Sequence, residues 1–190
     1  GRPEHYLPLM EECRRLEKDL SFDPAQEIHH IWDRDTFRKA LPLADRFFCN
    51  RNELRTALDY MGTTSPEELL RDGSTIINTR GGDGSLVFTG KGTWAVPAVR
   101  PTMVVDPTGA GDCYAGAALA FLEQARDFSF PSLRAALALG TVVASFCVEH
   151  FGPRALGEVR PGRIRERMDR WLEAVSLDRQ AVLPRLDVEG

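Results

Sequence analysis

The most informative segment of the sequence is Asp106-Pro107-Thr108-Gly109-Ala110-Gly111-Asp112. An apolar segment, residues 113–125, follows it with the spacing of a helix. Glycine and alanine leave the backbone between the two aspartates almost bare, so its N–H groups can point at an anion beside the positive end of the helix dipole. Asp112 stands where that helix is expected to begin. Its carboxylate is then either a helix cap or a base next to a bound phosphate, and the residues alone leave both roles open.

The longer run Asp-Pro-Thr-Gly-Ala-Gly-Asp-Cys-Tyr-Ala-Gly-Ala, residues 106–117, closely resembles the second signature of the ribokinase-like, or PfkB-type, sugar and nucleoside kinases. The resemblance implies that Gly109, Ala110 and Gly111 form an anion hole for the transferred phosphoryl group. It also implies that Asp112 deprotonates the substrate hydroxyl. Backbone groups around Asp106 and Thr108 would then help to bind a monovalent cation, if this member of the family uses one.

Composition predicts a globular chain without a nucleic-acid partner. Hydrophobic residues make up 43% of the 190 residues, and the formal net charge is -4. The arginine-rich stretch 154–170 is interrupted by acidic residues, so we expect a solvated helix face there. No apolar run reaches transmembrane length and the N-terminus does not resemble a signal peptide, so we expect no membrane association. The four cysteines stand far apart, which indicates neither a zinc site nor a disulfide framework and fits a reducing cytoplasm.

A second motif follows a predicted buried strand, residues 46–49. Asn50 can cap the next helix and Glu53 lies in its first turn, as in a capping box. The kinase family carries an Asn-x-x-Glu motif at this place, so the resemblance implies that Asn50 and Glu53 organise Mg²⁺ and phosphate through water. Mg²⁺ usually keeps several waters and needs few protein carboxylates, so one Glu is enough.

A third motif lies between two predicted strands, residues 74–79 and 85–89. As a bare pattern it is a β-hairpin with a glycine turn. The resemblance implies that Thr79, Gly81 and Gly84 contact the nucleotide, and that Gly152 belongs to a closing loop beside it. Arg80 replaces an apolar residue of the family's pattern, and it can either reach a phosphate or point to solvent.

The periodicity of the remaining segments predicts the other elements. We expect helices over 4–20, 27–41, 132–148 and 163–175, a helix start at Ser65, strands at 20–22 and 93–96, and an extended Val104-Val105 leading to the central motif. The predicted fold is α/β, a three-layer α/β/α ribokinase-like arrangement. Its sheet is mainly parallel, with a small antiparallel hairpin region near residues 74–96. Residues 1–175 are expected to form the nucleotide-binding and catalytic part, and residues 176–190 a tail.

The resemblance covers only the C-terminal part of the family's usual length, so the N-terminal part and the lid strands are missing. The expected activity is ATP- and Mg²⁺-dependent phosphorylation of a hydroxyl on a sugar or nucleoside-like substrate, with this fragment alone inactive. Lost strands would expose sheet edges and favour self-association, and a homodimer of the complete protein stays open.

Two other classes of protein stay open. A non-catalytic nucleotide-binding or regulatory fragment of such a kinase is the main alternative. A dinucleotide-dependent oxidoreductase is disfavoured because Gly82-Asp83-Gly84 lies between two predicted strands, rather than between a strand and a helix.

Overall fold

The computed structural model describes residues 2–151 and 153–175, and they fall into two units. Unit 1 contains Gly1–Gly81 and Ser85–Ala95, and unit 2 contains Gly82–Gly84 and the chain from Val96 onward. Gly152 and the predicted tail 176–190 lie outside the described residues. The domain boundary after residue 175 therefore stays a prediction.

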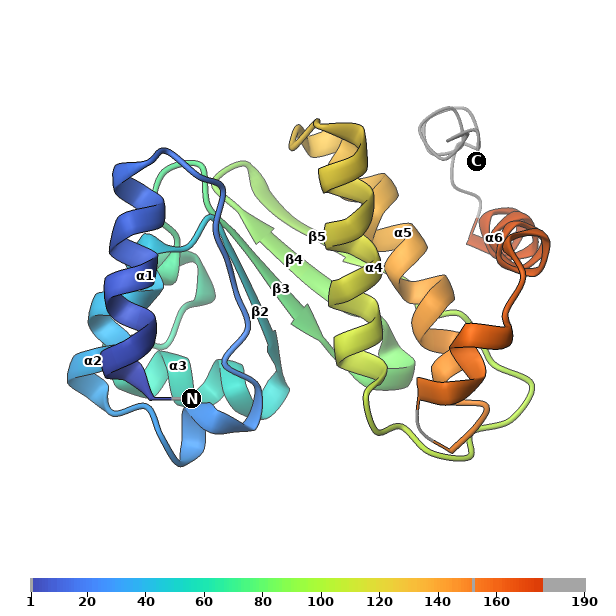
Figure 1. Cartoon of the computed structure of the whole chain (residues 1–190), viewed down its shortest axis with the longest axis horizontal. Helices are drawn as coiled ribbons and strands as arrows, with labels where there is room; N and C mark the ends of the chain where they lie inside the picture. Colours follow the sequence, from blue (N-terminus) through green and yellow to red (C-terminus); the bar gives the residue numbers. More distant parts are fainter. Residues whose placement is uncertain (1, 152, 176–190) are drawn as a thin grey trace. The chain divides into compact units, whose positions relative to one another are not determined.

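Unit 1 is built on a mixed sheet with the strand order β1-β2-β3-β4-β5 (Figure 1). β1 pairs with β2 and β2 with β3 in parallel, whereas β3 and β4 are antiparallel. The predicted α/β class, with a mainly parallel sheet and an antiparallel hairpin region, is confirmed. β1 is an end strand, so one of its edges has no neighbouring strand in the described chain. The strands are β1 Ser21–Phe22, β2 Arg46–Asn50, β3 Thr75–Thr79, β4 Ser85–Thr89 and β5 Gly92–Val96.

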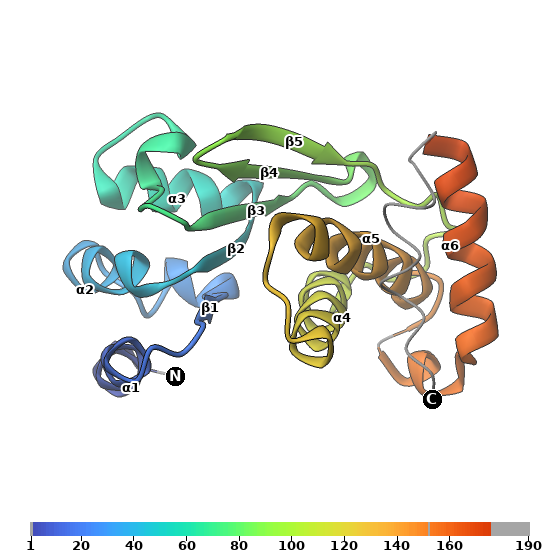
Figure 2. The ribbon, with the colours of Figure 1, turned by 90° about the horizontal axis from the view of Figure 1, so that it is seen from above.

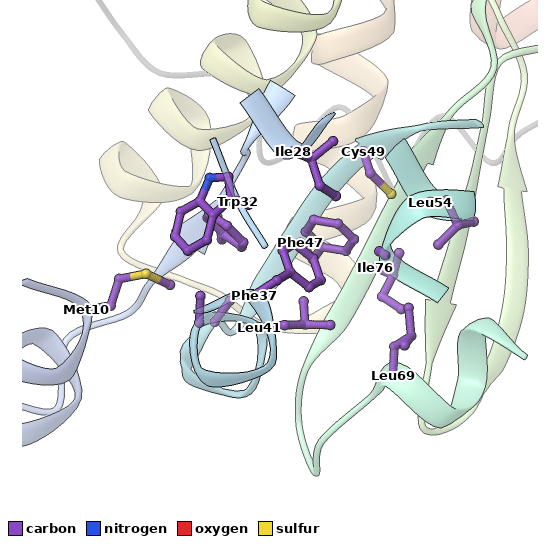
Figure 3. Close-up of a cluster of buried hydrophobic side chains, with 14 of the residues drawn as sticks. Met10, Ile28, Trp32, Phe37, Leu41, Phe47, Cys49, Leu54, Leu69 and Ile76 are labelled. Atoms are coloured by element: carbon purple, nitrogen blue, oxygen red, sulfur yellow. The ribbon is translucent and has the colours of Figure 1, made fainter. Parts of the chain in front are cut away.

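The helices of unit 1 share one apolar core with one face of this sheet (Figures 1 and 3). Phe37 is fully buried at its centre, and its ring lies 5.7–6.3 Å, centroid to centroid, from four other aromatic rings. Aromatic side chains dominate such cores because each buries a large apolar area. The helices are α1 Pro3–Arg15, α2 Arg34–Ala40 and α3 Arg51–Met61, with short 3-10 helices η1 Ala25–His29, η2 Leu41–Leu43 and η3 Pro66–Leu69. A fourth 3-10 helix, η4 Gly81–Asp83, begins at the last residue before the chain enters unit 2.

Three predicted helical segments of unit 1 differ from the structure. The helix predicted over 4–20 ends at Arg15, after which Glu17 adopts a positive φ of 52°. The helix predicted over 27–41 is split, because Asp33 caps a new helix by accepting a hydrogen bond of 2.8 Å from the Thr36 N–H. The predicted start at Ser65 leads only into the short η3, and the Ser65 side chain makes no cap hydrogen bond.

Unit 2 is helical, with α4 Ala110–Ala125, α5 Phe130–Cys147, η5 Pro153–Glu158 and α6 Pro161–Val175 (Figure 2). α5 is long and apolar enough for a membrane span, with a mean hydropathy of 1.5, so the expectation that no such run exists is wrong. However, 67% of its residues are buried, as they are in the core helix of a globular unit. α4 and α5 approach closely at Gly140, where a Cβ atom would lie 2.7 Å from the Tyr114 carbonyl oxygen.

Substitution of Gly140 by Ala tests this helix contact. Helix propensity alone favours Ala over Gly by about 1 kcal/mol. The overlap with the Tyr114 backbone should reverse that sign and lower the free energy of unfolding by about 1–3 kcal/mol. The matched control is Gly116→Ala in α4, where the added Cβ meets open space and a small stabilisation is expected. Urea denaturation measures both, and a Gly140→Ala variant as stable as the parent contradicts the close contact.

Candidate active site

The chain reaches the central motif through a segment anchored on the end of α5. The backbone N–H groups of Val105 and Asp106 both donate to the Val148 carbonyl, at 2.7 and 3.3 Å. One residue further along, the Glu149 carboxylate accepts a hydrogen bond of 2.9 Å from the Thr102 N–H. Val104 is 65% exposed, and residues 104–105 belong to no strand, so whether this lead-in is extended stays a prediction. The N–H groups that would enter a strand ladder are bonded to the end of a helix instead.

Glu149 belongs to a small charged cluster. Arg167 of α6 donates to it at 2.9 Å, and the side chains are only 14% and 9% exposed. Burial opposes ionisation, yet the hydrogen bonds from Arg167 and from the Thr102 N–H hold the pKa of Glu149 below its ordinary value. Arg167 also donates to the Ser145 hydroxyl at 3.0 Å. The expectation that residues 154–170 form only a solvated helix face is therefore wrong at Arg167.

Gly109 makes the turn from this segment into α4. It is the N-cap residue of the helix and has a left-handed backbone, with φ 78° and ψ 0°. α4 consequently begins at Ala110, inside the motif, rather than at residue 113 as predicted. The Ala110 N–H donates to the Pro107 carbonyl at 3.1 Å, and the Thr108 N–H donates to the Asp106 carboxylate at 2.9 Å. The turn is thus held by its own backbone and by one side chain.

Asp112 does not cap the helix. It lies in the first turn, three residues after the N-cap position, and it is exposed. Its carboxylate has no hydrogen-bond partner among residues 2–151 and 153–175, and neither do the N–H groups of Gly111 and Asp112 itself. Of the two roles that the sequence left open, the cap is therefore wrong. What remains is a free carboxylate beside two free N–H groups at the positive end of a helix.

Two thiols lie next to the turn. The Cys147 thiol donates to the Thr108 carbonyl at 3.6 Å. Burial, the neighbouring Cys147 and the charge of Asp112 raise the pKa of the Cys113 thiol to about 12. Cys113 therefore stays neutral near pH 7 and adds no negative charge where an anion would bind. All four cysteines are free thiols in the structure.

Unit 1 brings a second set of predicted site residues together at the carboxyl ends of β2 and β3. Asn50 and Thr79 are directly paired across these parallel strands. The predicted capping box is confirmed: the Asn50 side chain accepts from the Glu53 N–H at 3.0 Å, and the Glu53 carboxylate accepts from the Asn50 N–H at 2.7 Å. The Glu53 carboxylate is buried, and its second oxygen accepts from the Asn50 amide at 2.7 Å.

Asn50 and Glu53 suit Mg²⁺ only if the ion keeps its own water shell. In the part of the chain that the structure describes, no cluster of three or more His, Cys, Asp or Glu side chains could hold a metal ion. Both oxygens of Glu53 already accept hydrogen bonds within the capping box. The residues therefore fit an ion that keeps its own water shell, and they do not fit a cage of protein ligands.

In the glycine loop between β3 and β4, residues 80–84, glycine is needed at positions 81 and 84 for different reasons. Gly81 needs glycine only for its positive φ of 58°, since nothing lies within 4 Å of an added Cβ. At Gly84 a Cβ would lie 2.1 Å from the Val96 carbonyl oxygen, so the close approach of the chain's own backbone is by itself a reason for glycine here. Arg80 donates to the buried Asn78 side chain at 3.1 Å, and the Thr79 hydroxyl to the Cys49 carbonyl at 3.4 Å.

The chain is similar to carbohydrate and nucleoside kinases in sequence and in structure. The family model described as pfkB family carbohydrate kinase matches residues 1–158. A nucleoside kinase of Methanothermobacter thermautotrophicus is 30% identical over 153 residues, which are 80% of this chain and 47% of that protein.

Solved structures agree with the sequence matches. The nucleoside kinase of Burkholderia thailandensis in complex with inosine has a TM-score of 0.77 and 28% identity, covering 88% of this chain and 52% of that one. Its complex with ADP-inosine has a TM-score of 0.76 and 28% identity, covering 86% and 49%. The chain therefore spans about half the length of the relatives that it matches.

Substitution of Gly84 by Ala separates a structural glycine from a ligand-facing one. The positive φ alone costs roughly 1–2 kcal/mol for a residue with a Cβ, and the contact with the Val96 carbonyl adds to that cost. We expect the free energy of unfolding to fall by about 2 kcal/mol or more without any ligand. Gly82→Ala is the control, because it has open space and no positive φ. If Gly84→Ala and Gly82→Ala have the same melting temperature, the backbone contact is not the reason for glycine at position 84.

Proposed function

This chain belongs to the pfkB family of carbohydrate kinases, and we propose that it carries the nucleotide-binding and phosphoryl-transfer part of a nucleoside kinase. ATP is the proposed phosphoryl donor and a nucleoside hydroxyl the acceptor. The relatives named as nucleoside kinases support this substrate class over a free sugar. The start of α4 carries the proposal, because it presents a free carboxylate beside free N–H groups.

The proposed chemistry assigns one role to each part of that turn. Asp112 accepts the proton of the substrate hydroxyl as its oxygen attacks the terminal phosphorus of ATP, and ADP leaves with the electrons of the broken P–O bond. The N–H groups of Gly111 and Asp112, with the helix dipole behind them, stabilise the negative charge on the moving phosphoryl group. Gly109 and Ala110 shape the turn that aims these groups.

The remaining predicted residues serve the nucleotide and its ion. When bound, Mg²⁺ would neutralise charge on the phosphates, and Asn50 and Glu53 would hold it through water. Thr79, Gly81 and Gly84 form the proposed nucleotide loop, to which Gly152 would contribute from outside the described residues. A monovalent cation at the Asp106–Thr108 backbone stays a prediction.

A non-catalytic nucleotide-binding module is the second candidate function. The observation that favours it is coverage, since about half of each compared relative has no counterpart in this chain. Groups that position the acceptor and exclude water would lie in that half. Correct positioning of the reactants can lower an activation barrier by about 7–11 kcal/mol. Without it, an otherwise intact transfer site would have no measurable activity.

We therefore predict that these 190 residues bind MgATP but do not phosphorylate nucleosides by themselves. Binding should raise the melting temperature, because a ligand at 100 times its Kd stabilises by about 2.7 kcal/mol. Calorimetry and thermal melts measure the first expectation, and a coupled ADP-release assay with inosine measures the second. A folded sample without any MgATP binding contradicts the nucleotide loop, and robust turnover contradicts the proposed dependence on the absent half.

The role of Asp112 is tested in a complete kinase that contains this chain. Because the Asp112 side chain makes no cap hydrogen bond, Asp112→Asn should change the free energy of unfolding by less than about 0.5 kcal/mol. Loss of the base should lower kcat by about 10²–10⁴-fold with nearly unchanged ATP affinity. Glu123→Gln is the control, since it removes an exposed carboxylate from the other end of α4. Turnover of Asp112→Asn within a few-fold of the parent would falsify the assignment.

A further inference from the structure

Two of the four free thiols lie next to the glycine that makes the transfer turn. Cys113 is near the start of α4, and its N–H donates to the Gly109 carbonyl at 2.9 Å. Cys147 is the last residue of α5, and its sulfur lies 4.0 Å from the place that a Cβ atom of Gly109 would take. The two thiols also interact with each other directly. They therefore meet the first requirement of a disulfide, which is that the two side chains reach each other.

The helices that carry these cysteines are packed tightly. α4 and α5 run side by side (Figures 1 and 2), and a Cβ atom at Gly140 would lie only 2.7 Å from the Tyr114 carbonyl oxygen. Tyr114 follows Cys113 directly, and Gly140 lies about two helical turns before Cys147. Because this contact fixes both helices close to the two thiols, a bond between the sulfurs needs no large movement of either helix.

The two thiols differ in their access to solvent, and this difference sets the order in which they react. Cys113 is partly exposed, whereas Cys147 is fully buried. A dissolved oxidant therefore reaches Cys113 first, and Cys147 reacts with the intermediate. The other two cysteines, Cys13 and Cys49, belong to unit 1 and serve as a comparison.

Oxidation by a small-molecule disulfide, such as oxidised glutathione, gives a balanced route. The Cys113 sulfur loses its proton and attacks one sulfur of oxidised glutathione, and the first glutathione leaves as a thiolate that takes up a proton. The Cys147 sulfur, also deprotonated, then attacks the Cys113 sulfur of this mixed disulfide, and the second glutathione leaves in the same way. Two protein thiols have become one disulfide, and two electrons and two protons have passed to two molecules of reduced glutathione.

The new bond would act on both ends of the transfer turn. In the reduced chain, the Cys147 thiol donates to the Thr108 carbonyl at 3.6 Å. A disulfide sulfur carries no proton, so oxidation removes this hydrogen bond. The bond also draws Cys113 toward α5, and Cys113 directly follows Asp112. Oxidation thus displaces the turn from both sides.

The acidity of Cys113 determines how fast such a bond forms and how well it persists. Burial, the neighbouring Cys147 and the charge of Asp112 raise the pKa of the Cys113 thiol to about 12, so its thiolate is scarce near pH 7 and attack on an oxidant is slow. A low thiol pKa stabilises the reduced form of a dithiol, and Cys113 lacks that stabilisation. The disulfide therefore forms slowly and, once formed, resists reduction.

We propose that Cys113 and Cys147 form a reversible disulfide that disables the transfer turn, so that oxidation by a small-molecule disulfide regulates the chain. Formation of the bond depends on the two cysteines alone. Its effect on catalysis rests on the proposed kinase function, and the two are measured separately.

The first test uses the 190-residue chain and needs no activity. After incubation with oxidised glutathione, mass spectrometry of a digest should find the peptides of Cys113 and Cys147 joined, and dithiothreitol should separate them. In NMR spectra, the amide signals of Thr108 and Asp112 should shift on oxidation and return on reduction. Absence of the linkage overturns the proposal, and so does a complete linkage that leaves both amide signals in place.

Two variants make this result specific, with circular dichroism showing that each is folded. Cys113→Ser keeps a small neutral side chain but removes the accessible thiol, so its turn signals should not respond to oxidised glutathione. Cys13→Ser is the matched control, because it removes a partly exposed thiol from unit 1 and should respond like the parent. Equal shifts of the turn signals in Cys113→Ser and in the parent contradict the proposal, since another modification then causes them.

The second test uses a complete kinase that contains this chain. Oxidation should lower kcat by about 100-fold, because a misplacement of about 1 Å can cost that much. Dithiothreitol should restore turnover, and Cys113→Ser should retain it in the presence of the oxidant. Full turnover with the linkage complete overturns the regulatory role and leaves the assignment of Asp112 intact. A reduced kinase without any turnover contradicts the proposed function instead, and the linkage in the 190-residue chain still decides whether the disulfide forms.

Discussion

The left-handed backbone of Gly109 is the constraint on which the candidate transfer site depends. With φ 78°, one residue turns the chain from an irregular segment into the first turn of α4. A residue with a Cβ would lose roughly 1–2 kcal/mol in this conformation, although an added Cβ would have room, at 4.0 Å from the Cys147 sulfur. Because the helix begins at Ala110, the N–H groups of Gly111 and Asp112 stay outside the helical hydrogen-bond ladder. The Asp112 carboxylate is then free for chemistry.

The two groups of site residues differ in whether a substitution can test their chemistry without disturbing the fold. Asn50 and Glu53 satisfy the start of α3 through hydrogen bonds of 2.7–3.0 Å, so their replacement disturbs the fold as well as any bound ion. Asp112 makes no such bond and can be changed without a structural cost. Gly84 is the opposite case, since its own backbone neighbours already explain the glycine. Substitution of Asp112 in α4 is therefore the clearest test of catalysis. The glycines between β3 and β4 are weaker evidence for a bound ligand than their sequence pattern indicates.

Local sequence signals predicted much of the fold. Apolar runs gave β2, β3 and α5 nearly to their ends, and Asn50 with Glu53 predicted the start of α3. Some predicted helix bounds were wrong because one polar residue interrupts a long apolar pattern, as Asp33 does by capping α2. Other features were not predicted because the backbone bonds to a partner that is distant in the sequence. The Val148 carbonyl holds residues 105 and 106, and no side-chain pattern signals such a bond. Arg167 was missed for a related reason, because its burial depends on Glu149, which lies in the turn after α5. The roles proposed for residues 109–112 came from a family resemblance. Composition and spacing alone could not decide whether Asp112 is a helix cap or a base.

The anchoring of residues 102–106 has a consequence for how such a site changes over evolution. The segment is held on its backbone side by the Val148 carbonyl and the Glu149 carboxylate, while Met103 and Val104 are 60% and 65% exposed. Main-chain N–H groups are common to every residue except proline. Side chains at positions 103 and 104 can therefore be exchanged without releasing the segment that leads to Gly109. Variation is permitted immediately before the turn, and new surface chemistry can arise there while the turn itself stays in place.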